Sequence, residues 1–243
     1  MGKAPKEPIE VFPEFISDCK EIFGHDLVSI ILYGSAAEGH YRPGKSDINF
    51  LVILSEEGID ALDRAFNKMA RWRKRNIATP LFLTEHYIQS SLDVYPLEYL
   101  NFQLHYQMVF GKDVLKDLTL NPSLVRLQCE RELKGKLLLL RRTFLETEGK
   151  ARALKSAIRF SLTAFMAIFE GLLFLKGQEP IKDRKQRIQQ VCKDFDLDYS
   201  VFATLLEIKE EKIKLRDEEI LELFKRYLKQ VRELAIKVDS MEV

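Results

Sequence analysis

The chain has 243 residues, of which 46% are hydrophobic and 31% charged, a composition typical of a folded globular protein rather than a disordered one. Lysine and arginine number 38 and aspartate and glutamate 37, and the resulting net charge of +1 gives no support for a general nucleic-acid binder. The three cysteines are far apart and form no CxxC pair, which argues against a disulfide framework or a zinc site and favours a reducing cytoplasm.

Short helical and strand patterns alternate in the first 118 residues. Apolar residues at helical spacing predict helices over residues 8–23 and 56–75, and Thr84 is placed to cap a short helix that ends near Ser91. Apolar runs, several of them β-branched or alternating, predict strands over residues 27–33, 47–54, 79–83, 95–102 and 108–110.

The remaining residues, from 119 onwards, have an almost entirely helical pattern. Asn121 and Pro122 suit a helix start, with asparagine at the cap and proline in the first turn. Four amphipathic stretches follow, over residues 124–144, 154–173, 201–213 and 217–238, the last with Asp217 at its cap position. The sequence therefore predicts an α+β protein, with a small mixed-sheet domain over residues 1–118 and an all-α four-helix-type bundle over residues 119–243.

The most apolar stretch, residues 160–175, is shorter than the roughly 20 residues that a membrane span needs. It also contains Glu170. We therefore expect a buried bundle helix and no membrane partner. Glu170 either faces a substrate cleft, or lies at the edge of the bundle or pairs with a neighbouring lysine or arginine, and these interpretations remain open.

A polar, glycine-bearing stretch separates the first two predicted strands. The first strand ends at Gly34 and Ser35, where glycine lets a phosphate approach main-chain N–H groups closely and the serine hydroxyl adds a donor. The second strand opens with Asp47, and Asn49 follows two residues later, so both side chains should point to one face. Two oxygen ligands beside a phosphate-binding turn can hold Mg²⁺ against a triphosphate.

This pattern resembles the signature of the nucleotidyltransferase superfamily, in which Gly-Ser is followed after about a dozen residues by Asp-x-Asp. The superfamily includes polymerase β and the kanamycin nucleotidyltransferases, and the likeness covers roughly residues 25–110. The helical half resembles the bundle that follows this domain in antibiotic nucleotidyltransferases and in paired HEPN–nucleotidyltransferase proteins. The resemblance implies an NTP as substrate and Mg²⁺ as cofactor. It also implies phosphate binding by Gly34, Ser35 and Ser46 and metal binding by Asp47 and Asn49.

Asn49 departs from the family pattern, in which a second carboxylate stands at this position. An amide oxygen can bind Mg²⁺ but brings no negative charge. A site with one carboxylate fewer should hold a second metal ion poorly, and that ion normally helps to activate the attacking hydroxyl. The departure therefore threatens catalysis more than it threatens nucleotide binding.

The family usually supplies a third carboxylate from a later strand, which orients or deprotonates the acceptor hydroxyl. Glu98 is our choice for this catalytic and metal-binding role, because an acid among the apolar residues of a predicted strand is costly without a partner. Asp93 is the rival, but it follows a predicted helix, where a capping or loop role suits an aspartate.

Other charged groups have both a functional and a structural interpretation. Arg42 and Lys45 precede Asp47 and would either contact phosphates or be solvated loop charges. The basic run at residues 71–75 suits the C-terminal end of a helix, and its alternative role is an acceptor-RNA contact with Trp72 stacked on a base. The four histidines all lie in the first half, so the Arg-then-His ribonuclease motif of active HEPN domains cannot occur in the helical half.

We therefore predict a cytoplasmic enzyme that transfers a nucleoside monophosphate from an NTP such as ATP to a hydroxyl group. The acceptor would be a small molecule, a protein or an RNA end. Two other functions remain open: a nucleotide-binding sensor without turnover, which Asn49 favours, and an interaction protein that binds a separate helical partner. Self-association as a homodimer also remains open.

Overall fold

The β-branched run at residues 27–33 forms an inner strand of a four-stranded sheet in the computed structural model, which describes residues 4–243. The strand order is β3-β2-β1-β4; β1 is antiparallel to both of its neighbours, and β2 is parallel to β3. The sheet is therefore mixed, as the sequence predicts. Its strands are β1 (Leu27–Tyr33), β2 (Asn49–Leu54), β3 (Leu81–Thr84) and β4 (Tyr106–Gly111).

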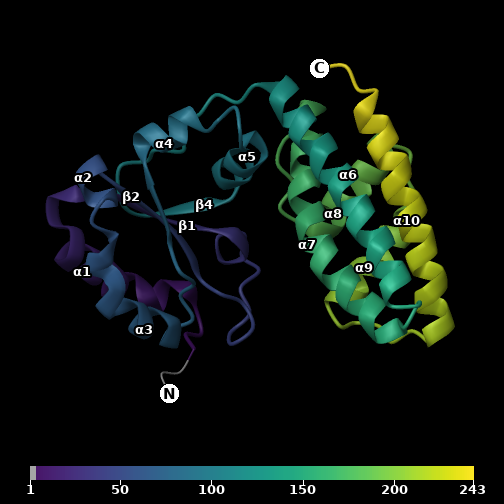
Figure 1. Ribbon diagram of the computed structural model, residues 1–243, viewed down its shortest axis with the longest axis horizontal. Coiled ribbons are helices and arrows are strands. Elements are labelled where there is room, and N and C mark those ends of the chain that lie inside the picture. The colour runs from purple at the N-terminus through teal and green to yellow at the C-terminus, as the bar shows by residue number, and fades with distance from the viewer. Residues whose placement is uncertain (1–3) are drawn as a thin grey trace. The chain divides into compact units, whose positions relative to one another are not determined.

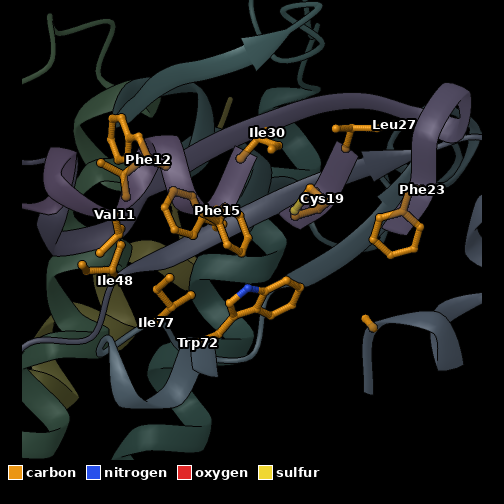
Figure 2. Packing of buried hydrophobic residues seen from close by; sticks show 14 of the residues in the cluster. Val11, Phe12, Phe15, Cys19, Phe23, Leu27, Ile30, Ile48, Trp72 and Ile77 are labelled. Carbon is orange, nitrogen blue, oxygen red and sulfur yellow. The ribbon is translucent and has the colours of Figure 1, made fainter. Parts of the chain in front are cut away.

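Helices α1 (Phe12–Phe23) and α3 (Phe66–Lys74) cover one face of this sheet around an apolar cluster (Figures 1 and 2). Phe15 lies at its centre: its ring stacks on Phe50 of β2 at 4.3 Å between centroids and meets Trp72 of α3 edge-on at 5.0 Å. Side chains from three distant parts of the sequence thus hold the sheet that carries the candidate site.

Two elements of the first half differ from the predictions. The single helix expected over residues 56–75 is broken into α2 (Glu56–Ile59), a 3₁₀ turn (Leu62–Ala65) and α3. Gly58 of α2 lies so close to Asp26 that a β-carbon at this glycine would be 2.8 Å from the Asp26 Cβ, so α2 packs tightly against the turn that carries Asp26.

The strand predicted over residues 95–102 is wrong, because this segment forms helix α5 (Pro96–Leu104). Proline suits the first turn of a helix. Leu97 and Leu100 are buried three residues apart, which is helical rather than strand spacing. By contrast, Thr84 caps α4 (Glu85–Ser90) as predicted, and its hydroxyl accepts the Tyr87 N–H at 3.0 Å.

The second half is all helical, which confirms the predicted fold class of an α+β protein with a helical bundle. One helix, α8, is not among the four predicted, because its apolar residues are few and its sequence is highly charged. Asp217 is not a cap, since the cap residue of α10 is Arg216, whose N–H donates to Glu219 at 2.8 Å. The helices are α6 (Pro122–Glu146), α7 (Ala151–Leu175), α8 (Arg184–Asp194), α9 (Tyr199–Lys209) and α10 (Asp217–Asp239).

The chain divides into two units. The first comprises the described residues up to Val94 together with Phe102–Thr119, and the second comprises Tyr95–Asn101 together with Leu120–Val243. The division into domains 1–118 and 119–243 stays a prediction, and residues 1–3 of that first domain lie outside the described part.

Helix α7 has 25 residues and is apolar enough to cross a membrane, but 56% of its most apolar window is buried inside the structure. Core helices of soluble proteins share this length and composition, so these features do not by themselves make α7 a membrane span. Glu170 of α7 is buried and pairs with Arg187 of α8 at 2.5 Å, which agrees with the interpretation of Glu170 as a paired residue.

Candidate active site

The turn after β1 begins with a glycine that the backbone requires. Gly34 has φ +72°, a left-handed conformation that residues with a side chain rarely adopt. Its carbonyl accepts the N–H groups of Ala37 at 2.9 Å and Glu38 at 3.0 Å, which closes a single 3₁₀ turn that includes Ser35. Because Gly34 has no side chain, this turn lies beside Asn49: a β-carbon on Gly34 would be 3.4 Å from the Asn49 amide nitrogen.

Asp47 and Asn49 lie where the next strand begins. Asn49 is the first residue of β2, pairs with Tyr33 of β1 and is half-buried, whereas Asp47 is exposed and lies just before the strand rather than in it. Ile48 between them is fully buried and donates its N–H to the Asn76 carbonyl at 2.8 Å. This anchor fixes the backbone on either side of Ile48, so the Asp47 carboxylate stays at the exposed end of the sheet.

Ser46 has a clear local role. Its hydroxyl oxygen accepts the Arg42 N–H at 3.1 Å, and its own N–H donates to the Arg42 carbonyl at 2.9 Å. The Asn76 side chain donates to the Ser46 carbonyl at 3.2 Å. Ser46 therefore holds the turn that leads into Asp47, and its hydroxyl proton remains available for a ligand; the predicted phosphate contact stays a prediction.

Three further residues of this loop precede Asp47 closely in the sequence. Arg42 and Lys45 are both exposed in the turn before Asp47. Tyr41 donates its hydroxyl proton to the Pro5 carbonyl at 3.1 Å. Burial raises the pKa of Tyr41, and the negative charges of nearby acids, Asp47 among them, raise it further. The sequence analysis did not single out Tyr41, although an aromatic residue inside a polar loop was a usable signal.

Three residues of the basic run at residues 71–75 make structural contacts inside the first unit. Trp72 is 1% exposed and donates its indole N–H to the Asp18 carboxylate at 2.9 Å, so stacking of Trp72 on an RNA base is wrong. Arg71 binds the same carboxylate and also Glu14, at 3.1 Å. Arg75 pairs with Glu14 at 3.5 Å. These contacts join α3 to α1.

Residues 13–116 match the family model of the nucleotidyltransferase domain. This part of the chain is a nucleotidyltransferase domain. A protein from Methanocaldococcus jannaschii that bears the name protein adenylyltransferase is 43% identical over 54 residues. These residues are 22% of this chain and 36% of that protein, so the match spans about a third of the relative's length.

A solved structure extends the likeness to both halves of the chain. The spectinomycin adenyltransferase AAD(9) from Enterococcus faecialis, with ATP and spectinomycin, superimposes with a TM-score of 0.51 over 92% of this chain and 99% of that one. The identity is 11%, so this likeness shows the fold alone. The nucleotidyltransferase domain and the helical half are thus arranged along the chain as the sequence analysis expected.

The nucleotidyltransferase domain offers oxygen ligands that fit one Mg²⁺ ion. Asp47 supplies a carboxylate and Asn49 an amide oxygen, and Mg²⁺ commonly takes one or two protein oxygens together with substrate phosphates. Residues 4–243 contain no cluster of three or more His, Cys, Asp or Glu side chains that could hold a metal. The chemistry of these two side chains fits one ion bound together with a nucleotide, and magnesium binding by Asp47 and Asn49 stays a prediction.

Glu98 is not in the environment that suggested its role. It lies on α5, not on a strand, and it is exposed between the buried residues Leu97 and Tyr99. It belongs to the second unit, where the Gln128 side chain donates to its carboxylate. The argument from a costly charge in a strand therefore fails, and the catalytic and metal-binding role of Glu98 stays a prediction. Asp93, its rival, lies in an exposed turn before α5.

Proposed function

We propose that this protein is a Mg²⁺-dependent adenylyltransferase. The observation that carries the proposal is the position of the Gly34 turn against Asn49, with the exposed Asp47 carboxylate beside them, in a domain of the nucleotidyltransferase family. The names of its relatives, protein adenylyltransferase and spectinomycin adenyltransferase, support ATP as the nucleotide and a protein or small-molecule hydroxyl as the acceptor.

The reaction is a substitution at the α-phosphorus of ATP. The acceptor oxygen forms a bond to this phosphorus, the bond from it to the bridging oxygen breaks, and pyrophosphate leaves while the hydroxyl proton passes to a base or to water. Catalysis of this kind depends mostly on positioning and on neutralising charge.

Each site residue has a part in this scheme. Main-chain N–H groups of the Gly34 turn and the Ser35 hydroxyl would hold the terminal phosphates, because glycine lets them approach the backbone. Asp47 and Asn49 would hold Mg²⁺, which when bound supplies positive charge against the triphosphate. With one carboxylate fewer, the site relies more on Arg42 and Lys45, which are exposed close to Asp47 in sequence and would neutralise the departing pyrophosphate.

A second function, nucleotide sensing without turnover, is favoured by Asn49 alone. In this case the protein binds Mg²⁺-ATP but does not transfer AMP, because the site lacks the charge to hold a second ion. Both functions require nucleotide binding, and they differ in how Asn49→Asp acts on turnover.

The first experiment is thermal unfolding with ATP, GTP, CTP or UTP at millimolar concentration, with and without Mg²⁺. A ligand at about a hundred times its Kd adds ~2.7 kcal/mol, which for a chain of this size raises Tm by about 5–10 °C. We expect this shift for wild type with ATP and Mg²⁺, and its loss in Asp47→Ala. Asp63→Ala is the matched control, because Asp63 is an exposed carboxylate of the same domain outside the site. No shift with any nucleotide would refute both functions.

Turnover separates the two functions. AMP transfer is followed as pyrophosphate release and as label from α-labelled ATP on protein or small-molecule hydroxyl acceptors. Loss of a measurable wild-type activity in Asn49→Asp would rule out the sensor. Activity that appears only in Asn49→Asp would establish the sensor and refute the enzyme.

A further inference from the structure

Helices α6 and α7 of the second unit form a groove on the surface of the bundle. The two helices pack side by side, and the groove between them has a volume of about 660 Å³. Its lining is mainly apolar and includes the buried Leu140 of α6 and the small residues Ala157 and Ala164 of α7. A groove of this size and lining is typical of a binding site rather than of ordinary surface.

A large aromatic side chain projects beside this hollow. Phe160 of α7 lines the groove and is 81% exposed. Ala157, three residues before Phe160, and Ala164, four residues after it, lie on the same face of the helix. One surface therefore carries both a projecting ring and a hollow. A two-fold contact between identical copies needs both features on one surface, because each copy presents the same patch to the other.

The residues of α7 that line the groove fit an antiparallel contact with a second α7. They form three pairs that are symmetric about the midpoint between positions 158 and 159. In a two-fold contact centred there, Ala153 lies opposite the partner's Ala164, Ser156 opposite the partner's Ser161, and Ala157 opposite the partner's Phe160. Each pair joins two small residues, or a large residue and a small one. The two helices can therefore approach closely without a clash of large side chains.

The charge at the groove does not oppose a second copy. Among the described residues 4–243, Lys136 is the one charged residue that lines the groove, and it pairs with Glu132 of its own chain at 2.8 Å. Arg159, beside the centre of the contact, pairs with Glu211 at 3.4 Å. Arg152 is exposed and does not line the groove, so its charge is screened by water and salt. Acidic side chains of the same chain thus already balance the charges nearest the groove.

We propose that this groove binds a second copy of the same chain, with α7 of one copy antiparallel to α7 of the other. Phe160 of each copy enters the hollow at Ala157 of the partner subunit, and burial of the two rings supplies the main driving force. Eleven residues line the groove, about half of the 20–30 residues on each side of a standard interface, so we expect a weak dimer with a Kd of roughly 1–100 µM. The proposal concerns the second unit alone and does not depend on the nucleotidyltransferase activity.

The test is sedimentation velocity of the full chain at concentrations from about 1 to 300 µM, which span the expected Kd. We expect a shift from monomer to dimer across this range. Phe160→Ala removes the projecting ring and should weaken the dimer at least tenfold. Phe66→Ala is the matched control, because Phe66 is 75% exposed on α3 of the first unit, and it should change Kd less than twofold.

An exchange of the two opposed residues tests the antiparallel register. In the double variant Ala157→Phe/Phe160→Ala, the ring and the small residue exchange places, and they still lie opposite each other across the two-fold axis. We expect this variant to regain the wild-type Kd to within about threefold. A folded double variant that dimerises as weakly as Phe160→Ala would overturn the register. Circular dichroism and Tm of each variant check that it is folded.

Three further results would overturn the proposal. The first is a wild-type protein that stays monomeric over the whole concentration range. The second is a dimer whose Kd is unchanged in Phe160→Ala, or is weakened as much by Phe66→Ala, because another surface would then form it. The third is a monomer that binds vesicles of phosphatidylglycerol and phosphatidylcholine and loses this binding in Phe160→Ala, which would assign the groove to a membrane.

Discussion

The buried ion pair between α7 and α8 provides the sharpest test of the energetics of the helical unit. Glu170 and Arg187 are each 1% exposed, and their oxygen and nitrogen atoms lie 2.5 Å apart. Arg187 also donates two hydrogen bonds to the Ile181 carbonyl, at 3.0 and 2.9 Å, which hold the segment that follows α7. Glu170→Gln keeps the size of the side chain and removes its charge, so the buried Arg187 loses the negative charge of this partner.

The expected magnitude follows from this burial. Breaking a buried pair by removing one partner costs about 3–5 kcal/mol, and each kcal/mol shifts Tm by about 2–4 °C in a chain of this size. We therefore expect Glu170→Gln to lower Tm by roughly 6–20 °C. An exposed pair supplies the matched control: Glu146 and Arg142 on α6 are 58% and 75% exposed. Glu146→Gln should cost less than ~0.5 kcal/mol.

A double-mutant cycle completes the experiment. Replacing both partners with apolar residues, Glu170→Leu together with Arg187→Met, removes the charges together and should be less damaging than Glu170→Leu alone or Arg187→Met alone, the two single variants of this cycle. Thermal unfolding of the wild type, both single variants and the double variant is followed by circular dichroism at 222 nm. The reasoning is refuted if Glu170→Gln shifts Tm no more than Glu146→Gln does, or if the two single effects add in the double variant.

Three other predictions concern the rest of the molecule. Gly111→Ala should abolish soluble expression or lower Tm severely, because Gly111 has φ +81° and its new β-carbon would lie 2.0 Å from the Val28 carbonyl oxygen. Burial opposes ionisation of Asp18, but hydrogen bonds chiefly from Trp72 and from basic side chains outweigh burial and hold its pKa below the usual 3.8. This contribution to the free energy of unfolding is present above about pH 4 and is lost as the pH falls through the folded-state pKa. Asp18→Asn should therefore be less stable near neutral pH, and its stability should depend less on pH in the acid range. Unfolding is followed by the fluorescence of the single tryptophan. Burial raises the pKa of all three cysteines to about 12. A thiol reagent at pH 8 should therefore label no cysteine in the native protein and three cysteines after denaturation. Rapid labelling of the native protein would contradict this burial.

The sequence predicted the elements whose pattern is local and strong. The β-branched run of β1 had the observed bounds, Leu27–Tyr33, and the Asn121 cap of α6 holds the Ser123 N–H at 2.9 Å as expected. The Gly34 turn was also predictable, because only glycine readily adopts its left-handed conformation. In these places the propensity of a few neighbouring residues and the tertiary fold agree.

Where local patterns were ambiguous, the predictions failed. The segment at residues 95–102 contains enough apolar residues for a strand or a helix. Packing of Leu97 and Leu100 in the second unit favours the helix, α5. Helix α8 has too few apolar residues to stand out, and it is held by the buried Arg187 together with its apolar face.

The sequence by itself determined the chemistry of the candidate site. Gly34 has the backbone freedom for a phosphate-binding turn, Asp47 supplies a carboxylate, and Asn49 supplies an amide where the family has a second carboxylate. Only the tertiary structure decided which residues are neighbours in the folded protein. It placed Asn49 against Gly34, buried Trp72 against Asp18, and put Glu98 at an exposed position of a helix in the other unit. The physical reason is that residue type fixes charge and backbone freedom locally, whereas neighbours depend on strand register and helix packing between segments far apart in the chain.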